Sequence, residues 1–201
     1  MKLQDHWSET NRRIFNLLEG GTKYVVGCLE CQDKRDTFEP FTTLRLTLQD
    51  KSSYRDGTAS LETLLHERLS YEELLDKENK VECAFCDKRT TTSKKMRLTT
   101  PPSILAIQLK RFEWTDFVKP NQKKQVNKVE GKKLQTHVTF TEELALQGES
   151  TDGELTTTHY KLKAVIEHVG TSSPSGHYFA MTKPDSEGKL WTYYSDTICN
   201  Q

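Results

Sequence analysis

Apolar residues recur at helical spacing in two stretches of the chain. The first covers residues 1–20 and ends at Gly20-Gly21, so it predicts a short amphipathic helix. The second covers residues 60–75, where leucines share one face and Ser60 is a candidate N-cap, so it predicts a pair of helical segments. A single helical turn is expected over residues 141–146.

Most of the remaining pattern predicts β-strands. Short stretches of alternating, β-branched or aromatic residues lie between turn residues. The expected strand regions are 22–27, 36–48, 89–98, 104–109, 137–140, 159–168, 178–181 and 191–194. The most apolar of these, residues 104–109, is expected to be a buried central strand, whereas residues 89–98 are expected to form an exposed strand.

The last two expected strands form a hairpin that places a histidine against polar partners. They flank residues 183–189, a run of turn residues. A hairpin folded about Ser186 places His177 directly opposite Ser195, and a fold half a step later places it opposite Asp196. Either side chain could orient the imidazole as the third member of a catalytic triad does. Half of a hydrolytic site is therefore visible in the sequence.

Four of the five cysteines form two Cys-x-x-Cys pairs, Cys28 with Cys31 and Cys83 with Cys86. In a reducing compartment, two such pairs are typical ligands of one tetrahedral zinc ion. The gap of about 50 residues exceeds the usual spacing in zinc ribbons, so the site would clamp two distant hairpins. Four unrelated thiols are the alternative. A redox role is disfavoured because neither pair begins a helix after a strand.

Composition excludes several classes of protein. The 201 residues carry a formal net charge of zero, which argues against nucleic acid as the main partner, and the lysine-rich residues 119–133 are interpreted as a solvated loop. No run of 18 apolar residues predicts a membrane-spanning helix, and the first residues contain no apolar signal segment. We expect a cytoplasmic or nuclear protein of one large or two small domains.

In this order, the features resemble the catalytic domain of the ubiquitin-specific proteases (USP, peptidase family C19). The segments that carry the resemblance are Phe15–Gly21 before the first cysteine pair, Ser60–Leu65 before the second, Pro102–Phe112 and Tyr160–Asp196. The resemblance implies an α+β fold, with a papain-like palm, zinc-finger-like fingers, mostly antiparallel sheet and few helices. It implies a partial domain over 1–201, with fingers over about 22–100, a palm over about 101–201 and no thumb.

The resemblance also assigns roles to the residues of the hairpin. His177 matches the catalytic base, and Ser195 occupies the position of the third triad residue, which is usually Asp or Asn. Asp196 matches the acidic residue that follows it and can assist catalysis through the oxyanion region. A serine brings no charge to stabilise an imidazolium, so this triad is expected to be electrostatically weaker. The resemblance makes Zn²⁺ a structural cofactor and ubiquitin or a ubiquitinated protein the partner.

The nucleophile of this family is a cysteine in a Gly-x-x-Cys-Tyr-x-Asn box before the first zinc knuckle. None of the 27 residues before Cys28 is a cysteine. Cys199, the remaining thiol, is expected on the strand that carries Ser195, about 13 Å further along, and is interpreted as inert. We therefore expect a chain related to thiol-dependent deubiquitinases but catalytically incomplete by itself. The alternatives are a non-catalytic, zinc-stapled ubiquitin-binding module and a truncated remnant.

Three further features allow two interpretations each. By resemblance, His168 lies near the active-site cleft, and a structural histidine is the alternative. Lys110-Arg111 is either a solvated pair after a strand or part of a channel lining. Trp191 is expected to anchor the core of the hairpin.

Overall fold

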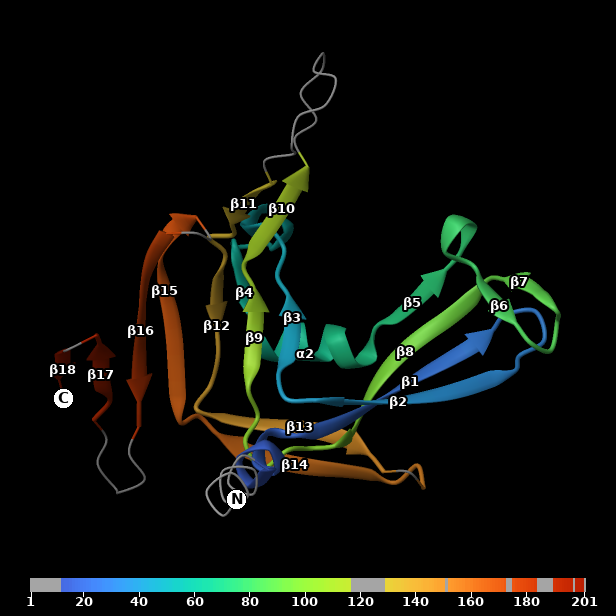
Figure 1. Cartoon of the computed structure of the whole chain (residues 1–201), viewed down its shortest axis with the longest axis horizontal. Helices are drawn as coiled ribbons and strands as arrows, with labels where there is room; N and C mark the ends of the chain where they lie inside the picture. Colours follow the sequence, from blue (N-terminus) through green and yellow to red (C-terminus); the bar gives the residue numbers. More distant parts are fainter. Residues whose placement is uncertain are drawn as a thin grey trace, which may run out of the picture. The chain divides into compact units, whose positions relative to one another are not determined.

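A computed structural model of the chain describes residues 12–116, 129–150, 152–172, 175–183, 190–196 and 198–200. Strands dominate this part of the chain (Figure 1). They are β1 Gly20–Cys28, β2 Lys34–Phe41, β3 Leu44–Thr47, β4 Thr58–Ser60, β5 Glu72–Leu75, β6 Val81–Cys83, β7 Lys88–Thr90, β8 Thr92–Thr100, β9 Ile107–Lys110, β10 Phe112–Asp116, β11 Val129–Lys133, β12 His137–Thr139, β13 Glu143–Glu149, β14 Leu155–Lys161, β15 Ala164–Ser172, β16 Ser175–Thr182, β17 Thr192–Ser195 and β18 Ile198–Asn200. The helical elements are residues 12–18, α2 Leu61–Ser70 and the single 3₁₀ turns η1 Lys51–Ser53 and η2 Lys77–Asn79.

The predicted fold class, a mostly antiparallel sheet structure with few helices, is confirmed. All strand pairs with a determined register are antiparallel except β4 with β12. Among the described residues, no helix has the length and apolar character needed to cross a membrane.

The chain divides into two compact units that alternate along the sequence. The first contains Met1–Leu46, Leu61–Leu109 and Ala145–Tyr160, and the second contains Thr47–Ser60, Lys110–Leu144 and Lys161–Gln201. The division into fingers and palm near residue 100 stays a prediction.

The first unit is built on a four-stranded sheet in the order β2-β1-β8-β5. β1 is an inner strand that pairs along its whole length with β2 on one side and β8 on the other. Pro40 lies on β2, the edge strand, where its missing N–H removes no bond from the inner ladder. Helix α2 packs on β8 with Leu64 and Leu65 buried. The apolar core of this unit lies between the helix and the inner strands.

Residues 60–75 form one helix and one strand rather than two helical segments, so that part of the prediction was wrong. Strand β5 follows α2 and pairs with β8. The register places Glu72 opposite Lys95 and Glu73 opposite Lys94. Opposite charges that face each other across antiparallel strands stabilise the pairing. A contact made only in the folded chain therefore decides the conformation of this segment.

The predicted exposure was wrong for two strands. β8, expected to be exposed, is an inner strand on which Met96 and Leu98 are buried. Residues 104–109, expected to be a buried central strand, contain only the start of β9, which lies in a two-stranded sheet with β3, and Ile104 is 52% exposed. Position within the sheet, rather than apolar composition, determines burial here.

The remaining expectations are mostly confirmed. β1, β12, β16 and β17 match the predicted strands, and the predicted N-terminal helix is confirmed over residues 12–18, with residues 1–11 outside the described part. Residues 36–48 and 159–168 each contribute to two strands, and the helical turn expected over 141–146 is instead the start of β13. Part of the predicted lysine-rich loop forms β11, and its residues 119–128 lie outside the described chain.

The second unit contains a six-stranded sheet in the order β10-β11-β15-β16-β17-β18. Beside it, β4 and β12 pair in parallel, with Val138 opposite Ala59 and both side chains buried. The buried Thr136 hydroxyl donates to the carbonyl of Gln49 at 2.8 Å. Arg111 donates to the carbonyls of Leu134 and Thr136 at 3.5 and 2.7 Å. Arg111 therefore stabilises this layer and is not part of a solvated pair, although Lys110 is exposed.

A buried ion pair fastens the β13–β14 hairpin to the main sheet of the first unit. The Lys23 ammonium, on inner strand β1, lies 2.7 Å from a carboxylate oxygen of Glu149 on β13, and only 7% of Lys23 is exposed. Asp36 and Arg97 lie 3.6 Å from Lys23 and 3.5 Å from Glu149, respectively. The hydrogen bond from Lys23 lowers the pKa of Glu149, and the same bond raises the pKa of Lys23.

We expect Glu149→Gln to lower the free energy of unfolding by roughly 2 kcal/mol, because it leaves the buried Lys23 ammonium without its closest counter-charge. The exposed Glu154→Gln, in the same hairpin, is the control and changes it by less than about 0.5 kcal/mol. The stabilisation from Glu149 is present above the ordinary carboxyl pKa of 4.5 and is lost as pH falls through the lowered folded value. Urea unfolding at pH 7 and below 4.5 measures both effects, and equal stability of the two variants at pH 7 would contradict the assignment.

Candidate functional site

The structure brings the two cysteine pairs together in the first unit. Cys28 ends β1, and Cys83 ends β6, while Cys31 and Cys86 lie in the turns that follow. The residue after each pair, Gln32 and Asp87, adopts a positive φ of 62° and 51°. This left-handed conformation closes each turn tightly, so that both thiols of a pair point to the same side.

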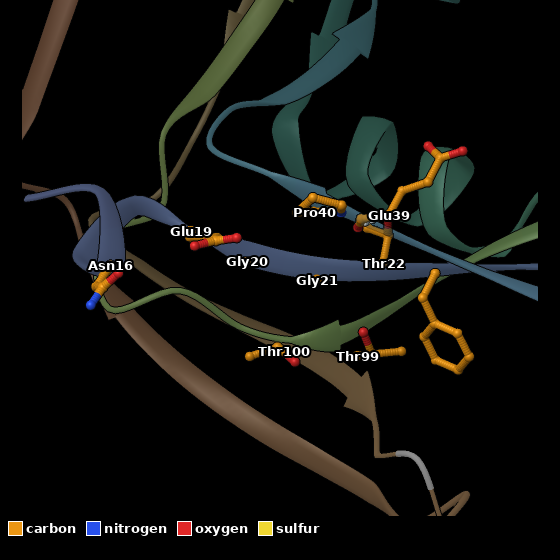
Figure 2. Close-up of a pocket in the computed structure, with 10 residues that line it drawn as sticks. Asn16, Glu19, Gly20, Gly21, Thr22, Glu39, Pro40, Thr99 and Thr100 are labelled. Atoms are coloured by element: carbon orange, nitrogen blue, oxygen red, sulfur yellow. Dashed lines mark hydrogen bonds between the residues drawn. The ribbon is translucent and has the colours of Figure 1, made fainter. Parts of the chain in front are cut away.

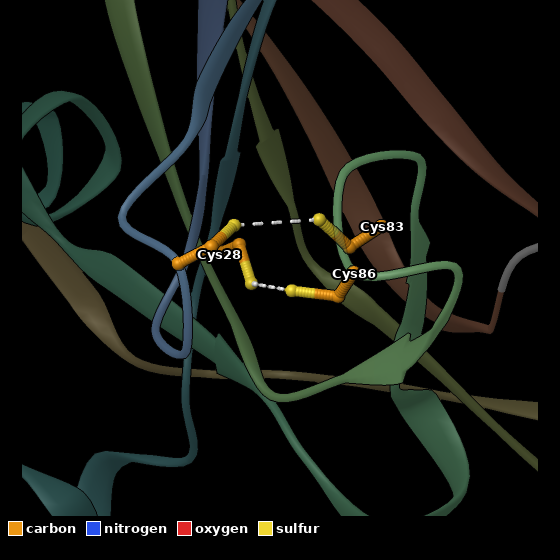
Figure 3. Close-up of side chains that lie close together, drawn as sticks. Cys28, Cys83 and Cys86 are labelled. Atoms are coloured by element: carbon orange, nitrogen blue, oxygen red, sulfur yellow. Dashed lines mark hydrogen bonds between the residues drawn. The ribbon is translucent and has the colours of Figure 1, made fainter.

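The four sulfur atoms have the spacing of a tetrahedral metal site (Figure 3). All four lie within 4.8 Å of one another, with 4.0 Å between Cys28 and Cys86 and 3.7 Å between Cys31 and Cys83. A tetrahedron with zinc–sulfur bonds of about 2.3 Å has sulfur atoms about 3.8 Å apart. The donor set therefore fits Zn²⁺, and the distances are too long for disulfide bonds.

The thiols differ in acidity because of their neighbours. The Thr90 hydroxyl, 3.2 Å from the Cys28 sulfur, is the main cause that lowers the pKa of Cys28 to about 6. The hydrogen bond with Cys31 is the main cause that raises the pKa of Cys86 to about 12. The Cys28 thiolate thus forms readily, whereas the neighbouring cysteines oppose formation of the Cys86 thiolate. A divalent cation among the sulfur atoms would remove this opposition, since every ligand is then a stabilised thiolate.

The predicted hairpin of His177 exists, with a different register. β16 and β17 pair with Ala180 opposite Tyr194 and Met181 opposite Tyr193. This is shifted by two residues from the fold about Ser186 and by one from the alternative, so neither predicted pairing of His177 is correct. The aromatic contact between Phe179 and Tyr193, with ring centroids 5.2 Å apart, favours the observed register.

The predicted neighbours of His177 nevertheless lie beside it. Because of the shift, Ser195 is a diagonal neighbour on the same face, and its Oγ lies 2.6 Å from His177 Nε2. Asp196 Oδ2 lies 3.7 Å from His177 Nδ1, which is an ion pair only when the imidazole is protonated. Asp196 has a φ of 48°, which turns its side chain back toward the histidine. The arrangement can orient an imidazole and stabilise its charged form.

Cys199 does not continue the strand of Ser195, so the predicted position was wrong. The chain turns after β17, and β18 runs back beside it with Ser195 opposite Ile198 and Tyr194 opposite Cys199. In the ladder, Cys199 belongs to the row of Tyr194 and Ala180 rather than to that of His177. The alternation of faces along a strand separates the two rows.

A close contact between two strands fixes the backbone beside His177. Gly176 has a φ of 149°, and a Cβ atom there would lie 2.5 Å from the carbonyl oxygen of Val169 and 2.1 Å from the ring of His168. The His168 ring lies between Phe112 and Tyr178, with centroids 5.8 and 4.7 Å away, and its Nδ1 is buried without a hydrogen-bond partner. These contacts favour the structural interpretation of His168.

Two further observations complete the candidate sites. Trp191, expected as a core anchor, is half-buried with the Lys183 ammonium 6.0 Å from its ring centroid. A cavity of about 440 Å³ lies at the start of β1, between the end of helix 12–18 and strands β2 and β8 (Figure 2). It is lined by Gly20, Gly21 and threonines but by no cysteine or histidine, so none of the predicted site residues belongs to it.

Comparison with known proteins identifies the family. The profile described as ubiquitin carboxyl-terminal hydrolase (UCH) matches residues 1–201, and the chain belongs to this family. It is 30% identical over 189 residues to a probable ubiquitin carboxyl-terminal hydrolase creB of Aspergillus clavatus, covering 94% of this chain and 22% of the relative. It is 30% identical over 182 residues to the human ubiquitin carboxyl-terminal hydrolase 17, covering 90% of this chain and 30% of the relative.

Solved structures show the same fold. The chain is similar, with a TM-score of 0.70 and 24% identity, to a chain in the structure of the SAGA Ubp8/Sgf11/Sus1/Sgf73 DUB module bound to ubiquitin aldehyde. A second structure of that module, bound to monoubiquitin, gives a TM-score of 0.68. Both alignments cover 92% of this chain and 37% of the solved chain. The chain thus spans between about a fifth and two-fifths of the length of these proteins.

The Thr90 and Lys23 contacts were missed by sequence reasoning. Both are single polar residues in strands, and their roles arise only from partners more than 50 residues away. The sole signal for Lys23 was a charged residue within an apolar strand pattern.

Gly176→Ala is expected to lower the free energy of unfolding by at least about 2 kcal/mol, because a side chain there meets the Val169 carbonyl and the positive φ is strained. Gly153→Ala is the matched control: its φ is 83°, but nothing lies within 4 Å of the added Cβ, so the strain alone costs about 1 kcal/mol. Chemical unfolding compares them. If both variants lose equal stability, the contact beside His177 does not constrain the hairpin.

Proposed function

We propose that this chain is a zinc-stapled, ubiquitin-binding member of the ubiquitin carboxyl-terminal hydrolase family whose 201 residues do not by themselves hydrolyse ubiquitin conjugates. One observation carries the proposal: the placement of its cysteines. Four of the five thiols form the metal-binding cluster, and the fifth, Cys199, lies in a ladder row other than that of His177. This distribution of the cysteines supports the proposal that none of them serves His177 as a nucleophile.

The histidine site supports a role in hydrolysis only together with a nucleophile from elsewhere. In the proposed reaction, His177 accepts the thiol proton and the resulting thiolate attacks the carbonyl carbon at the ubiquitin C-terminus. His177 then protonates the leaving amine as the carbon–nitrogen bond breaks. Water, deprotonated by His177, attacks the remaining thioester, which releases the ubiquitin carboxylate and restores the thiol. Ser195, at hydrogen-bond distance, would hold the ring, and Asp196 would stabilise the imidazolium. The cysteine could come from a longer form of the polypeptide or from another chain.

Ubiquitin as the partner is supported by the family and by the solved neighbours, which are modules bound to monoubiquitin or ubiquitin aldehyde. Reduced thiols are required for the zinc site, so we place the protein in the cytoplasm or nucleus. When bound, Zn²⁺ would serve as a structural ion held by Cys28, Cys31, Cys83 and Cys86. All four positions are thiols, which leaves no open position for a water as in catalytic zinc sites.

The purified chain is expected to bind one zinc ion. Cys83→Ser should abolish zinc binding and unfold the β6–β7 hairpin, because its three-residue strands depend on the cluster to stay ordered. Metal analysis and far-UV circular dichroism measure the two effects. Cys199→Ser is the control and should retain both zinc and fold. A folded chain without metal at micromolar zinc would refute the structural role.

Ubiquitin carrying a C-terminal thiol-reactive electrophile is expected to leave the mass of the zinc-loaded chain unchanged, because in this proposal no thiol of the chain serves His177 as a nucleophile. Titration of the same protein with unmodified ubiquitin, followed by NMR or calorimetry, is expected to show saturable binding. An adduct that disappears in both His177→Ala and Cys199→Ser would overturn the non-catalytic proposal. A folded, zinc-loaded chain that does not bind ubiquitin would instead identify a remnant.

A further inference from the structure

Thr90 is a fully buried polar residue beside the cysteine cluster. It ends β7 and has a relative exposure of 0%. Its hydroxyl oxygen lies 3.2 Å from the Cys28 sulfur, within the range of a hydrogen bond to sulfur. A buried hydroxyl needs a hydrogen-bond partner to offset the loss of water, and the sulfur atom fills that need here.

The contact joins the two halves of the cluster. Cys28 belongs to the first knuckle, whereas Thr90 lies on the strand that follows the second knuckle, opposite Val81 in the β6–β7 hairpin. The backbone supports this approach, since the Leu29 N–H donates to the Thr91 carbonyl at 3.1 Å. The Thr92 hydroxyl donates to the Thr90 carbonyl at 3.2 Å. Thr90 is thus positioned by the hydrogen bond between Leu29 and Thr91 and by the hydrogen bond from Thr92 to its own carbonyl.

We infer that Thr90 is a positioning residue of the metal site, whose hydroxyl donates a hydrogen bond to the Cys28 sulfur when that sulfur is a thiolate ligand. The inference rests on the proposed zinc site. A protonated Cys28 can donate to Thr90, but a metal-bound thiolate can only accept, so the hydroxyl must then turn its proton toward the sulfur. This bond disperses negative charge among four close sulfur atoms and fixes the direction of the Cys28 side chain.

Substitutions at position 90 separate the hydroxyl from the shape of the side chain. Thr90→Val keeps the branched shape and removes the hydroxyl, and Thr90→Ser keeps the hydroxyl. Thr92→Val is the matched control, because Thr92 is 2% exposed and its hydroxyl donates to a backbone carbonyl rather than to a sulfur. Should the valine variant fail to fold, Thr90→Ala removes the same hydroxyl and is compared with Thr90→Ser in the same way.

The affinity of the whole chain for Co²⁺ and Zn²⁺ is measured by chelator competition at constant pH, with the thiolate-to-cobalt charge-transfer absorption as the signal. Thr90→Val is expected to bind each ion about 10- to 100-fold more weakly than the wild type and to shift the charge-transfer band. Thr90→Ser is expected to restore both properties. Thr92→Val should leave the charge-transfer band unchanged and should weaken metal binding less than Thr90→Val does, because its hydroxyl does not contact a sulfur.

The outcomes distinguish this inference from the zinc proposal. If the wild-type chain binds neither ion, the zinc site itself is refuted. If the wild type binds but Thr90→Val binds equally well with an unchanged spectrum, the role of Thr90 is overturned. Equal weakening by Thr90→Val and Thr92→Val, or no rescue by Thr90→Ser, also overturns it, because a merely structural contribution would produce those results.

Discussion

The antiparallel pairing of β1 with β8 is the constraint on which the first unit depends. It joins residues more than 60 positions apart in the sequence, from Gly21 opposite Thr100 to Cys28 opposite Thr92. At one end of the pair, this register places Cys28, in the first knuckle, opposite Thr92, which begins β8. Further along it, Lys23 and Arg97 stand opposite each other, and both lie close to Glu149. A slip by one residue would turn both groups to the other face of the sheet.

The sequence predicts strands well where β-branched and aromatic residues are concentrated and poorly where a distant partner decides. β1 and β16 follow their local composition, through Tyr24-Val25-Val26 and Tyr178-Phe179, although these residues are half-buried or exposed. β5 does not, because the local sequence Glu72-Glu73-Leu74-Leu75 has helical character, whereas in the fold it pairs with β8 and places Glu72 and Glu73 opposite lysines. For the same reason, the apolar composition of residues 104–109 predicts a buried central strand, whereas the segment is partly exposed. Periodicity shows that a segment can be buried, but the order of strands in the sheet is not encoded locally.

The candidate sites show a similar division. The candidate metal site could be predicted from the sequence, because two Cys-x-x-Cys pairs are a typical ligand set of a tetrahedral ion, and distance along the chain is no obstacle once β1 and β8 pair. The histidine site was predicted by its residues but not by its register. A histidine side chain is long enough to reach a diagonal neighbour, so Ser195 remains its partner after a two-residue shift. A shift by two residues leaves Ser195 on the same face of the sheet as His177, although the two residues are no longer directly opposite.

The β6–β7 hairpin shows what a metal ion would contribute to this fold. Each strand has three residues, and an isolated two-stranded hairpin of this size is not stable in water. Its buried side chains are Cys83 and Thr90, while Phe85, the large apolar residue of its turn, is 79% exposed. The hairpin therefore has no apolar core to offset the conformational entropy of its ordering. Bonds from the thiols to an ion shared with the first knuckle would supply that free energy, so in our proposal the cluster serves as the core of this part of the chain.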